Sequence, residues 1–173
     1  KGDFASGDLS SLLTHPTTHW IHLTGAVDPL FLQTLGTTFK LHPLVLEDIA
    51  CRSERPKLDL YPAYLFIIVN LLSIDPKTFA ITSEQVSLVL GKNFVLSFIS
   101  KDGNFINPIK ERLRHGNNRI RQKEADYLAY AILDLVADHT FTVLNQLDLQ
   151  IETLEQELTR TTKPLILQRI QKI

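Results

Sequence analysis

The chain has 173 residues and a net charge of −1, from 18 basic and 19 acidic side chains. Its composition, 44% hydrophobic and 21% charged, is that of an ordinary globular domain and excludes a disordered or fibrous chain. Proteins that bind nucleic acid usually carry a basic excess, so no nucleic-acid partner is expected. Because the sequence holds no Met and ends within a helix-like stretch, we expect a fragment cut at both ends.

The single cysteine, Cys51, cannot form a disulfide within the chain, and a reducing compartment is the default expectation. No signal peptide is recognised, because the N-terminus lacks a long apolar core. The stretch from Tyr127 to Leu144 is apolar on a helical pattern, but it contains Asp134 and Asp138. Carboxylates argue against a membrane span, so the sequence predicts a soluble chain.

The first third of the chain predicts one strand and two helices. Residues 19–24 alternate between apolar and polar side chains, which indicates a short strand. Asp28 followed by a proline is typical of a helix start and predicts a helix over residues 29–39. A second short helix is predicted over residues 43–49, with His42 as its N-cap.

The middle of the chain is rich in branched and aromatic residues and predicts a series of strands. They are expected over residues 57–61, 64–74, 79–81, 86–90 and 94–99. Gly91-Lys92-Asn93 between the last two segments indicates a hairpin with three loop residues. Nearly continuous apolar strands are typical of a sheet that is covered on both faces. With helices before and after, the sequence predicts an α/β fold, an α/β/α sandwich with a mixed, largely antiparallel sheet.

The last third of the chain predicts helices. A helix is expected over residues 105–114, and no Pro or Gly interrupts residues 124–158, so one helix of roughly 35 residues is possible there. Five apolar residues in it, Leu144, Leu147, Ile151, Leu154 and Leu158, are spaced 3, 4, 3 and 4. This is the heptad pattern of a coiled-coil seam. A break is expected before Pro164, followed by the start of another helix over residues 165–173.

Two pairs of carboxylates are the candidate metal ligands. Asp134 and Asp138 are spaced i, i+4 on the long helix, so they share one face among largely apolar neighbours. Burying a charge without a partner is costly, so these carboxylates need either Arg or Lys partners or a divalent cation. Mg²⁺ uses one or two carboxylates and keeps several waters. Glu47 and Asp48 form the second pair, for which a solvated helix end is the simpler interpretation.

Other candidate sites are weaker. His15, His19 and His22 would share one face of a helix and could bind zinc, but Pro16 and the strand-like pattern argue against a helix. Surface and strand-edge histidines are the preferred interpretation. A hydrolase needs a nucleophile, a base and an oxyanion site. The sequence has no GxSxG, HExxH, P-loop or GxGxxG motif, and Ser97 has no local partner, so no enzyme is predicted.

Six segments stand out along the chain, namely WIHLTG at residues 20–25, HPLVLEDI at 42–49, RPKLD at 55–59, EQVSLVL at 84–90, IKERLR at 109–114 and ADYL at 125–128. In this order they resemble the CorA family of magnesium transporters. The resemblance runs from about Trp20 to Leu158, and HPLVLEDI followed by RPKLD is its most specific part. The family often has Asn at the position of His22, which is a mild departure.

The resemblance implies a homopentamer at the cell membrane, in which a cytoplasmic α/β domain continues into a long stalk helix. Two transmembrane helices with a Gly-Met-Asn motif would follow in each subunit, and a chain without Met does not contain that motif. We therefore expect residues 1–123 to form the α/β cytoplasmic domain. Residues 124–173 would form the long helix and the start of the stalk, truncated before the transmembrane helices.

The resemblance also implies weakly bound regulatory Mg²⁺ between neighbouring subunits. The family's acidic pair falls on Glu47 and Asp48, a further carboxylate falls on Asp134, and Asp138 matches another acidic position. The residue that matches Asp48 faces a stalk aspartate of the neighbouring subunit, which would lie beyond Ile173, whereas Glu47 and Asp134 would form a second site. Bound Mg²⁺ would hold the ring closed, and its loss would open the pore.

Two alternatives stay open at this point. One is a transporter domain of the same superfamily for zinc or another divalent cation, such as Co²⁺ or Ni²⁺. The other is a coiled-coil oligomerisation module without metal sensing. A Mg²⁺ titration of the assembled protein would distinguish sensing from a scaffold, because only a sensor is stabilised by the ion.

Overall fold

The structure, a computed structural model, describes residues 9, 17–51, 54–100, 104–115 and 119–160, without the side chains of residues 119 and 157–160. The expected break before Pro164 and the helix over residues 165–173 lie outside the described residues. The chain divides into two compact units. The first comprises Lys1–Asn70 with Glu84–Leu135, and the second comprises Leu71–Ser83 with Val136–Ile173.

Five strands form one mixed sheet in the order β1-β5-β4-β3-β2. Their bounds are β1 His19–Thr24, β2 Lys57–Leu60, β3 Tyr64–Ile74, β4 Ile81–Gly91 and β5 Phe94–Ile99. The edge strand β1 runs parallel to β5, whereas β5 with β4 and β2 with β3 are antiparallel. The predicted mixed, largely antiparallel sheet is therefore confirmed.

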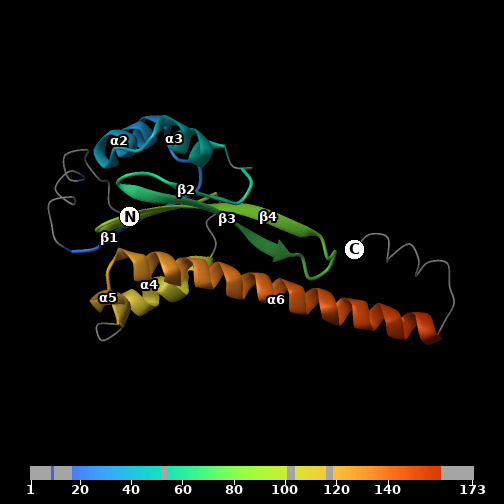
Figure 1. Cartoon of the computed structure of the whole chain (residues 1–173). Helices are drawn as coiled ribbons and strands as arrows, with labels where there is room; N and C mark the ends of the chain where they lie inside the picture. The colour runs from blue at the N-terminus through green and yellow to red at the C-terminus, as the bar shows by residue number, and fades with distance from the viewer. Residues whose placement is uncertain (1–8, 10–16, 52–53, 101–103, 116–118, 161–173) are drawn as a thin grey trace. The chain divides into compact units, whose positions relative to one another are not determined.

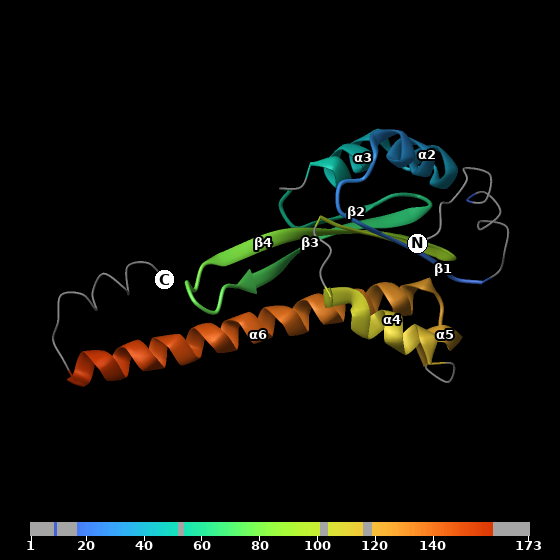
Figure 2. The same ribbon diagram turned by 180° about the vertical axis from the view of Figure 1, so that it is seen from behind.

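Helices cover both faces of the sheet in the first unit, which confirms the α/β/α sandwich (Figures 1 and 2). On one face lie α2 (Pro29–Phe39) and α3 (Pro43–Ala50). On the other lie the 3-10 turn η1 (Asn104–Ile106), α4 (Asn107–Arg114), α5 (Arg119–Gln122) and the first turns of α6 (Ala125–Arg160).

Each face of the sheet has its own apolar layer. The layer under α2 and α3 includes the buried side chains of Leu32, Leu35, Phe39, Val45, Ile49, Phe66, Leu96 and Phe98. The helices of the opposite layer bury Ile106, Ile109, Ile120, Leu128 and Ile132. All six residues of β5 are buried, as a strand covered on both faces requires.

The two helices over the first face begin where the sequence predicts. The Asp28 carboxylate accepts a hydrogen bond from the Phe31 N–H at 3.3 Å, and a proline occupies the first turn of α2. In α3, Nδ1 of His42 accepts from the Leu44 N–H at 3.2 Å. Histidine is a less usual cap than Asp or Ser, but its ring nitrogen satisfies a helix N–H in the same way.

Two predicted details of the β block are wrong. Gly91 belongs to β4, and the register places Leu90 opposite Val95, so the hairpin loop contains two residues rather than three. The expected short strand over residues 79–81 does not form as a separate element, because Phe79 has a positive φ of 58° in a turn and Ile81 is the first residue of β4. Asp75 organises that turn, since its Oδ1 accepts from the N–H groups of Lys77 and Thr78, both at 2.8 Å.

The predicted uninterrupted helix is confirmed as α6, which has 36 residues. Its residues up to Leu135 belong to the first unit and those from Val136 onward to the second. By length and composition, α6 is the one helix among the described residues that could cross a membrane. This is weak evidence, because its first turns bury Leu128 and Ile132 as a core helix of a globular domain does. A domain boundary between residues 123 and 124 stays a prediction.

Candidate metal centre

The Asp48 carboxylate, in the last turn of α3, is held by a lysine from the neighbouring strand. Nζ of Lys57 donates to Asp48 Oδ2 at 2.7 Å, and the two side chains are 33% and 17% exposed. The same ammonium lies 3.7 Å from the carboxylate of Asp59. The hydrogen bond to Asp48 raises the pKa of Lys57 above its ordinary value, although partial burial opposes the shift.

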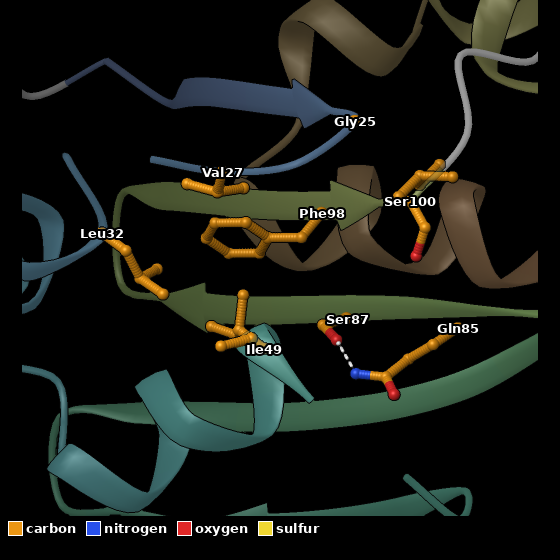
Figure 3. Close-up of a pocket in the computed structure, with 10 residues that line it drawn as sticks. Gly25, Val27, Leu32, Ile49, Gln85, Ser87, Phe98 and Ser100 are labelled. Carbon is orange, nitrogen blue, oxygen red and sulfur yellow. Dashed lines mark hydrogen bonds between the residues drawn. The ribbon is translucent and has the colours of Figure 1, made fainter. Parts of the chain in front are cut away.

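A buried glutamine fixes the backbone on which Asp48 sits. Gln85, from β4, is 5% exposed, and its Nε2 donates to the Asp48 carbonyl oxygen and to Ser87 Oγ, both at 2.9 Å (Figure 3). Its Oε1 accepts from the Glu54 N–H, also at 2.9 Å. A buried amide that satisfies both a donor and an acceptor of another segment holds that segment firmly. The end of α3 is thereby anchored to the sheet.

The N-terminal end of α3 is fixed by stacked aromatic rings. The rings of His42 and Tyr61 have centroids 5.8 Å apart, and those of Tyr61 and Tyr64 are 4.7 Å apart. The His42 N–H donates to the Tyr64 hydroxyl oxygen at 2.9 Å. Burial raises the pKa of the Tyr61 hydroxyl, and the nearby Tyr64, Asp59 and Asp48 add to the shift. Both ends of α3 are therefore tied to the strands beneath it.

A small cavity lies between α3 and the sheet (Figure 3). Val27, Leu32, Ile49, Phe98, Gln85 and Ser87 are among its lining residues, and its volume is about 80 Å³. Pockets that bind cofactors or drug-sized ligands are larger, at about 300–1,000 Å³. This cavity is too small for such a ligand, so the chemistry of the region rests on the carboxylates of α3.

The other predicted ligands are exposed. Glu47 points from α3 into solvent, and Asp134 and Asp138 are exposed on α6. The Tyr130 hydroxyl donates to Asp134 Oδ1 at a long 3.4 Å. The expectation that Asp134 and Asp138 must be compensated because they are buried is wrong, since the helix presents these carboxylates on its exposed face. No Arg or Lys ion pair compensates either of them within the part of the chain that the structure describes.

One chain does not bring the four predicted ligands together. Glu47 and Asp48 lie on α3 over one face of the sheet, whereas Asp134 lies on the part of α6 that covers the opposite face (Figures 1 and 2). Among the described residues, no group of three or more His, Cys, Asp or Glu side chains is placed to hold a metal ion. The described part of the chain therefore does not hold Glu47, Asp48 and Asp134 together as the ligands of one metal ion.

The histidine and serine candidates form a polar cluster across two strands. β1 pairs with β5 so that His22 lies opposite Ser97. Trp20 Nε1 donates to Ser97 Oγ at 2.8 Å, and His22 Nδ1 lies 2.8 Å from the same oxygen. Ser97, for which the sequence offered no partner, thus has two, and it is fully buried. His19 and His22 are strand-edge residues as expected, but His22 is half-buried, and His15 lies outside the described residues.

Two of the positioning residues were not found from the sequence. Gln85 is one of two polar residues, with Ser87, in a buried run of β4, and that mismatch with its apolar neighbours was the signal available. Lys57 lies in the RPKLD motif, but the motif assigned it no role, because that role depends on the packing of α3 over β2.

Solved structures share this architecture. The soluble domain of CorA from Methanocaldococcus jannaschii superposes with a TM-score of 0.67 at 17% identity, covering 88% of this chain and 60% of that one. The complete CorA magnesium transporter from the same organism gives a TM-score of 0.69 at 16% identity, covering 88% and 47%. The chain therefore has a fold similar to that of the CorA soluble domain.

The sequence comparisons define the family. Residues 17–173 match the family described as CorA-like Mg²⁺ transporter protein. A cobalt/magnesium transport protein CorA from Thermotoga maritima is 37% identical over 174 residues, which cover 99% of this chain and 50% of that protein. The chain belongs to the CorA family of metal ion transporters, as its motifs predict. The chain spans 50% of the length of this relative and 43% of the length of a second curated relative, a putative metal ion transporter from Bacillus subtilis.

Proposed function

We propose that this chain is the cytoplasmic regulatory domain of a cell-membrane transporter for divalent cations, with Mg²⁺ as the transported ion and as the regulator. Mg²⁺ would bind weakly between neighbouring subunits, to Glu47, Asp48, Asp134 and Asp138. The observation that carries the proposal is that Glu47 and Asp48 lie on a helix over one face of the sheet, whereas Asp134 lies on a helix over the opposite face. Such ligands are incomplete in one chain and become complementary when subunits pack side by side in a ring.

The chemistry of the carboxylates suits a hard cation. Mg²⁺ takes oxygen ligands, uses one or two carboxylates and retains several waters, so two exposed side chains from different subunits are sufficient. Zn²⁺ prefers His and Cys ligands in a closed tetrahedral arrangement. Glu47 and Asp134 are exposed and accessible to a hydrated ion.

The second half of α6 supports assembly of several copies into the proposed pentamer. In the predicted seam, Leu144 is 46% and Ile151 43% exposed, whereas Leu154 is buried at 6%, and the nearby Phe141 is 63% exposed. Apolar side chains repeated along one helix gain free energy when a partner helix covers them. A second copy of α6 supplies such a partner.

The gating mechanism follows from electrostatics. Without Mg²⁺, carboxylates that face one another across subunits repel, and the ring loosens. With Mg²⁺ bound between them, the closed ring is favoured, because the ion binds the closed arrangement more tightly than the open one. Scarce intracellular Mg²⁺ would empty the sites and open the pore, which gives negative feedback on uptake.

The test uses the full-length protein and its Asp48→Asn and Asp134→Asn variants, with Asp148→Asn as a control carboxylate exposed elsewhere on α6. In liposomes, Mg²⁺ inside should inhibit uptake by the wild type and by the control. The two site variants should need several times more Mg²⁺ for the same inhibition. If internal Mg²⁺ inhibits Asp48→Asn and Asp134→Asn as it does the wild type, these residues have no sensing role.

The same preparation tests the two alternatives. Thermal melting with Mg²⁺, Co²⁺, Ni²⁺ or Zn²⁺ at equal free concentrations ranks the ions by the stabilisation that they give. Stabilisation by Zn²⁺ at much lower concentrations than by Mg²⁺ would favour a zinc transporter. An assembled ring that melts at the same temperature with and without every ion would favour an oligomerisation module.

A further inference from the structure

The most protected of the four predicted ligands already carries a cation of the protein's own. The side chain of Asp48 is 17% exposed and receives the Lys57 ammonium at 2.7 Å. Within the described chain, ion pairs of this kind hold none of the other three predicted ligands. A metal ion that binds Asp48 must therefore displace the Lys57 ammonium from the carboxylate, whereas an ion that binds Asp134 displaces no ammonium.

We propose that Lys57 is a built-in counter-cation of the metal site. Its ammonium pairs with Asp48 when Mg²⁺ is absent and moves toward Asp59 when Mg²⁺ binds. This competition sets the Mg²⁺ concentration at which the site fills. This inference rests on the proposed function, because it assigns to Lys57 the tuning of that same site.

The Lys57 ammonium has two carboxylates within reach. Lys57 and Asp59 are two residues apart on β2, so their side chains project from the same face of the strand. The Lys57 nitrogen is 2.7 Å from Asp48 and 3.7 Å from Asp59. A flexible four-carbon stem can move the ammonium between the two carboxylates, so displacement from Asp48 does not leave it without a counter-charge.

The carboxylate is the fixed member of the pair. The carbonyl of Asp48 accepts from buried Gln85, and α3 is anchored at its other end by His42. Lys57, by contrast, projects from a four-residue strand at the edge of the sheet and is 33% exposed. When a metal ion binds, the Lys57 side chain moves while α3 keeps its position. The Asp48 oxygens therefore remain in place to coordinate the ion.

The counter-cation has two electrostatic consequences. First, it weakens repulsion in the empty ring, because each Asp48 that would face another carboxylate is already neutralised. Second, Mg²⁺ must displace an ammonium to obtain its ligand, which lowers the apparent affinity. The second effect shifts the filling of the site to higher Mg²⁺ concentrations, as a sensor requires when the ion is abundant.

The test compares Lys57→Gln and Lys57→Arg in the full-length protein. Glutamine removes the charge, so the midpoint of Mg²⁺-dependent thermal stabilisation should fall by roughly two- to fivefold, the range expected for a partly exposed ion pair. Arginine can bind the carboxylate with two hydrogen bonds, so its midpoint should rise. Opposite shifts cannot both come from a damaged fold. Lys92→Gln, which removes an exposed charge from the β4–β5 loop, should leave the midpoint unchanged.

Asp48→Asn, measured alongside, separates failure of this inference from failure of the proposed function. If neither the wild type nor any variant responds to Mg²⁺, the proposed function is wrong. If the wild type responds and Asp48→Asn does not, but Lys57→Gln has the wild-type midpoint, Lys57 is not a counter-cation. A higher midpoint in Lys57→Gln would also overturn the inference, because it would show that the lysine positions Asp48 for the metal rather than competing with it.

Discussion

The two helices that carry the predicted Mg²⁺ ligands are held in very different ways. On α3, the carboxylate of Asp48 is paired with Lys57, and its carbonyl is bound by Gln85. On α6, Asp134 and Asp138 are exposed, and the hydrogen bond to Asp134 is a long one, at 3.4 Å.

The difference shows how a shared site can be both specific and adjustable. A ligand that is fixed before the ion arrives loses little conformational freedom on binding and defines the geometry. A ligand on an exposed helix face loses more freedom, but it can adapt to the spacing between subunits. In the proposed ring, Asp48 on α3 would be a fixed ligand and Asp134 on α6 an adjustable one.

The largest expected effect is a difference in stability between substitutions in the first and in the second half of α6. Ile132, in the first half, is fully buried, and Ile132→Ala should lower the free energy of unfolding by about 3–4 kcal/mol through lost burial and a cavity. Leu144, in the second half, is 46% exposed, and Leu144→Ala should cost below about 1 kcal/mol in the isolated chain. Urea denaturation of both variants measures the contrast. Equal losses would mean that the first half is not the better-packed part.

The next effect tests the anchor of α3. Gln85→Ala leaves the Asp48 carbonyl and the Glu54 N–H without their buried partner, so the free energy of unfolding should fall by about 2–3 kcal/mol. Gln33→Ala, at an exposed position of α2, is the matched control and should change stability little. A loss in Gln85→Ala no larger than in the control would show that α3 does not depend on this amide.

A smaller effect is expected at the other end of α3. His42→Ala removes the ring nitrogen that caps Leu44 and the stacking on Tyr61, which should cost about 1 kcal/mol in urea denaturation. His42→Ser restores a cap without the ring, so it should recover part of the loss. If serine recovers nothing, the stacked rings rather than the cap hold the helix start.

The smallest effect concerns pH and distinguishes the paired carboxylate of α3 from the exposed ones of α6. The folded-state pKa of Lys57 is raised above its ordinary value of 10.5. The stability from its pair with Asp48 is therefore fully present below about pH 10.5 and is lost as pH rises through the raised pKa.

For a partly exposed pair this contribution is below about 1 kcal/mol. Urea denaturation between pH 9 and 12 should show the loss in the wild type and in Asp134→Asn. The loss should be smaller in Asp48→Asn, in which Lys57 keeps only the more distant carboxylate of Asp59 as its ion-pair partner. The same alkaline loss in Asp48→Asn would mean that other groups cause it.

Local patterns predicted much of the fold. Asp28 before a proline located the start of α2, and the branched, aromatic run of residues 64–74 gave the bounds of β3. The errors arose where a residue suits two roles. Gly91 is typical of a loop, yet here it continues β4 until the register with β5 ends. Phe79 has high strand propensity, but the turn built on Asp75 imposes a positive φ on it.

The surroundings of the candidate site were less predictable, because they depend on contacts between distant segments. Gln85 and Asp48 are 37 residues apart, and His22 and Ser97 are 75 apart. Asp134 looked buried because its sequence neighbours are apolar, yet helical geometry turns it outward. The sequence and its resemblance supplied candidate ligands, and only the packing of α3 over β2 and β4 reveals which of them is already engaged.

The short strand β2 has a consequence for solubility. It is an edge strand of four residues, and two of its side chains, Leu58 and Leu60, are 62% and 83% exposed. An open edge beside exposed leucines invites pairing with the edge of another molecule, and charges on such a strand oppose it. Lys57 and Asp59 are those charges. Lys57, which is proposed to tune the metal site, therefore also opposes pairing of the β2 edge with another molecule. Removing its charge should make the protein more prone to aggregate.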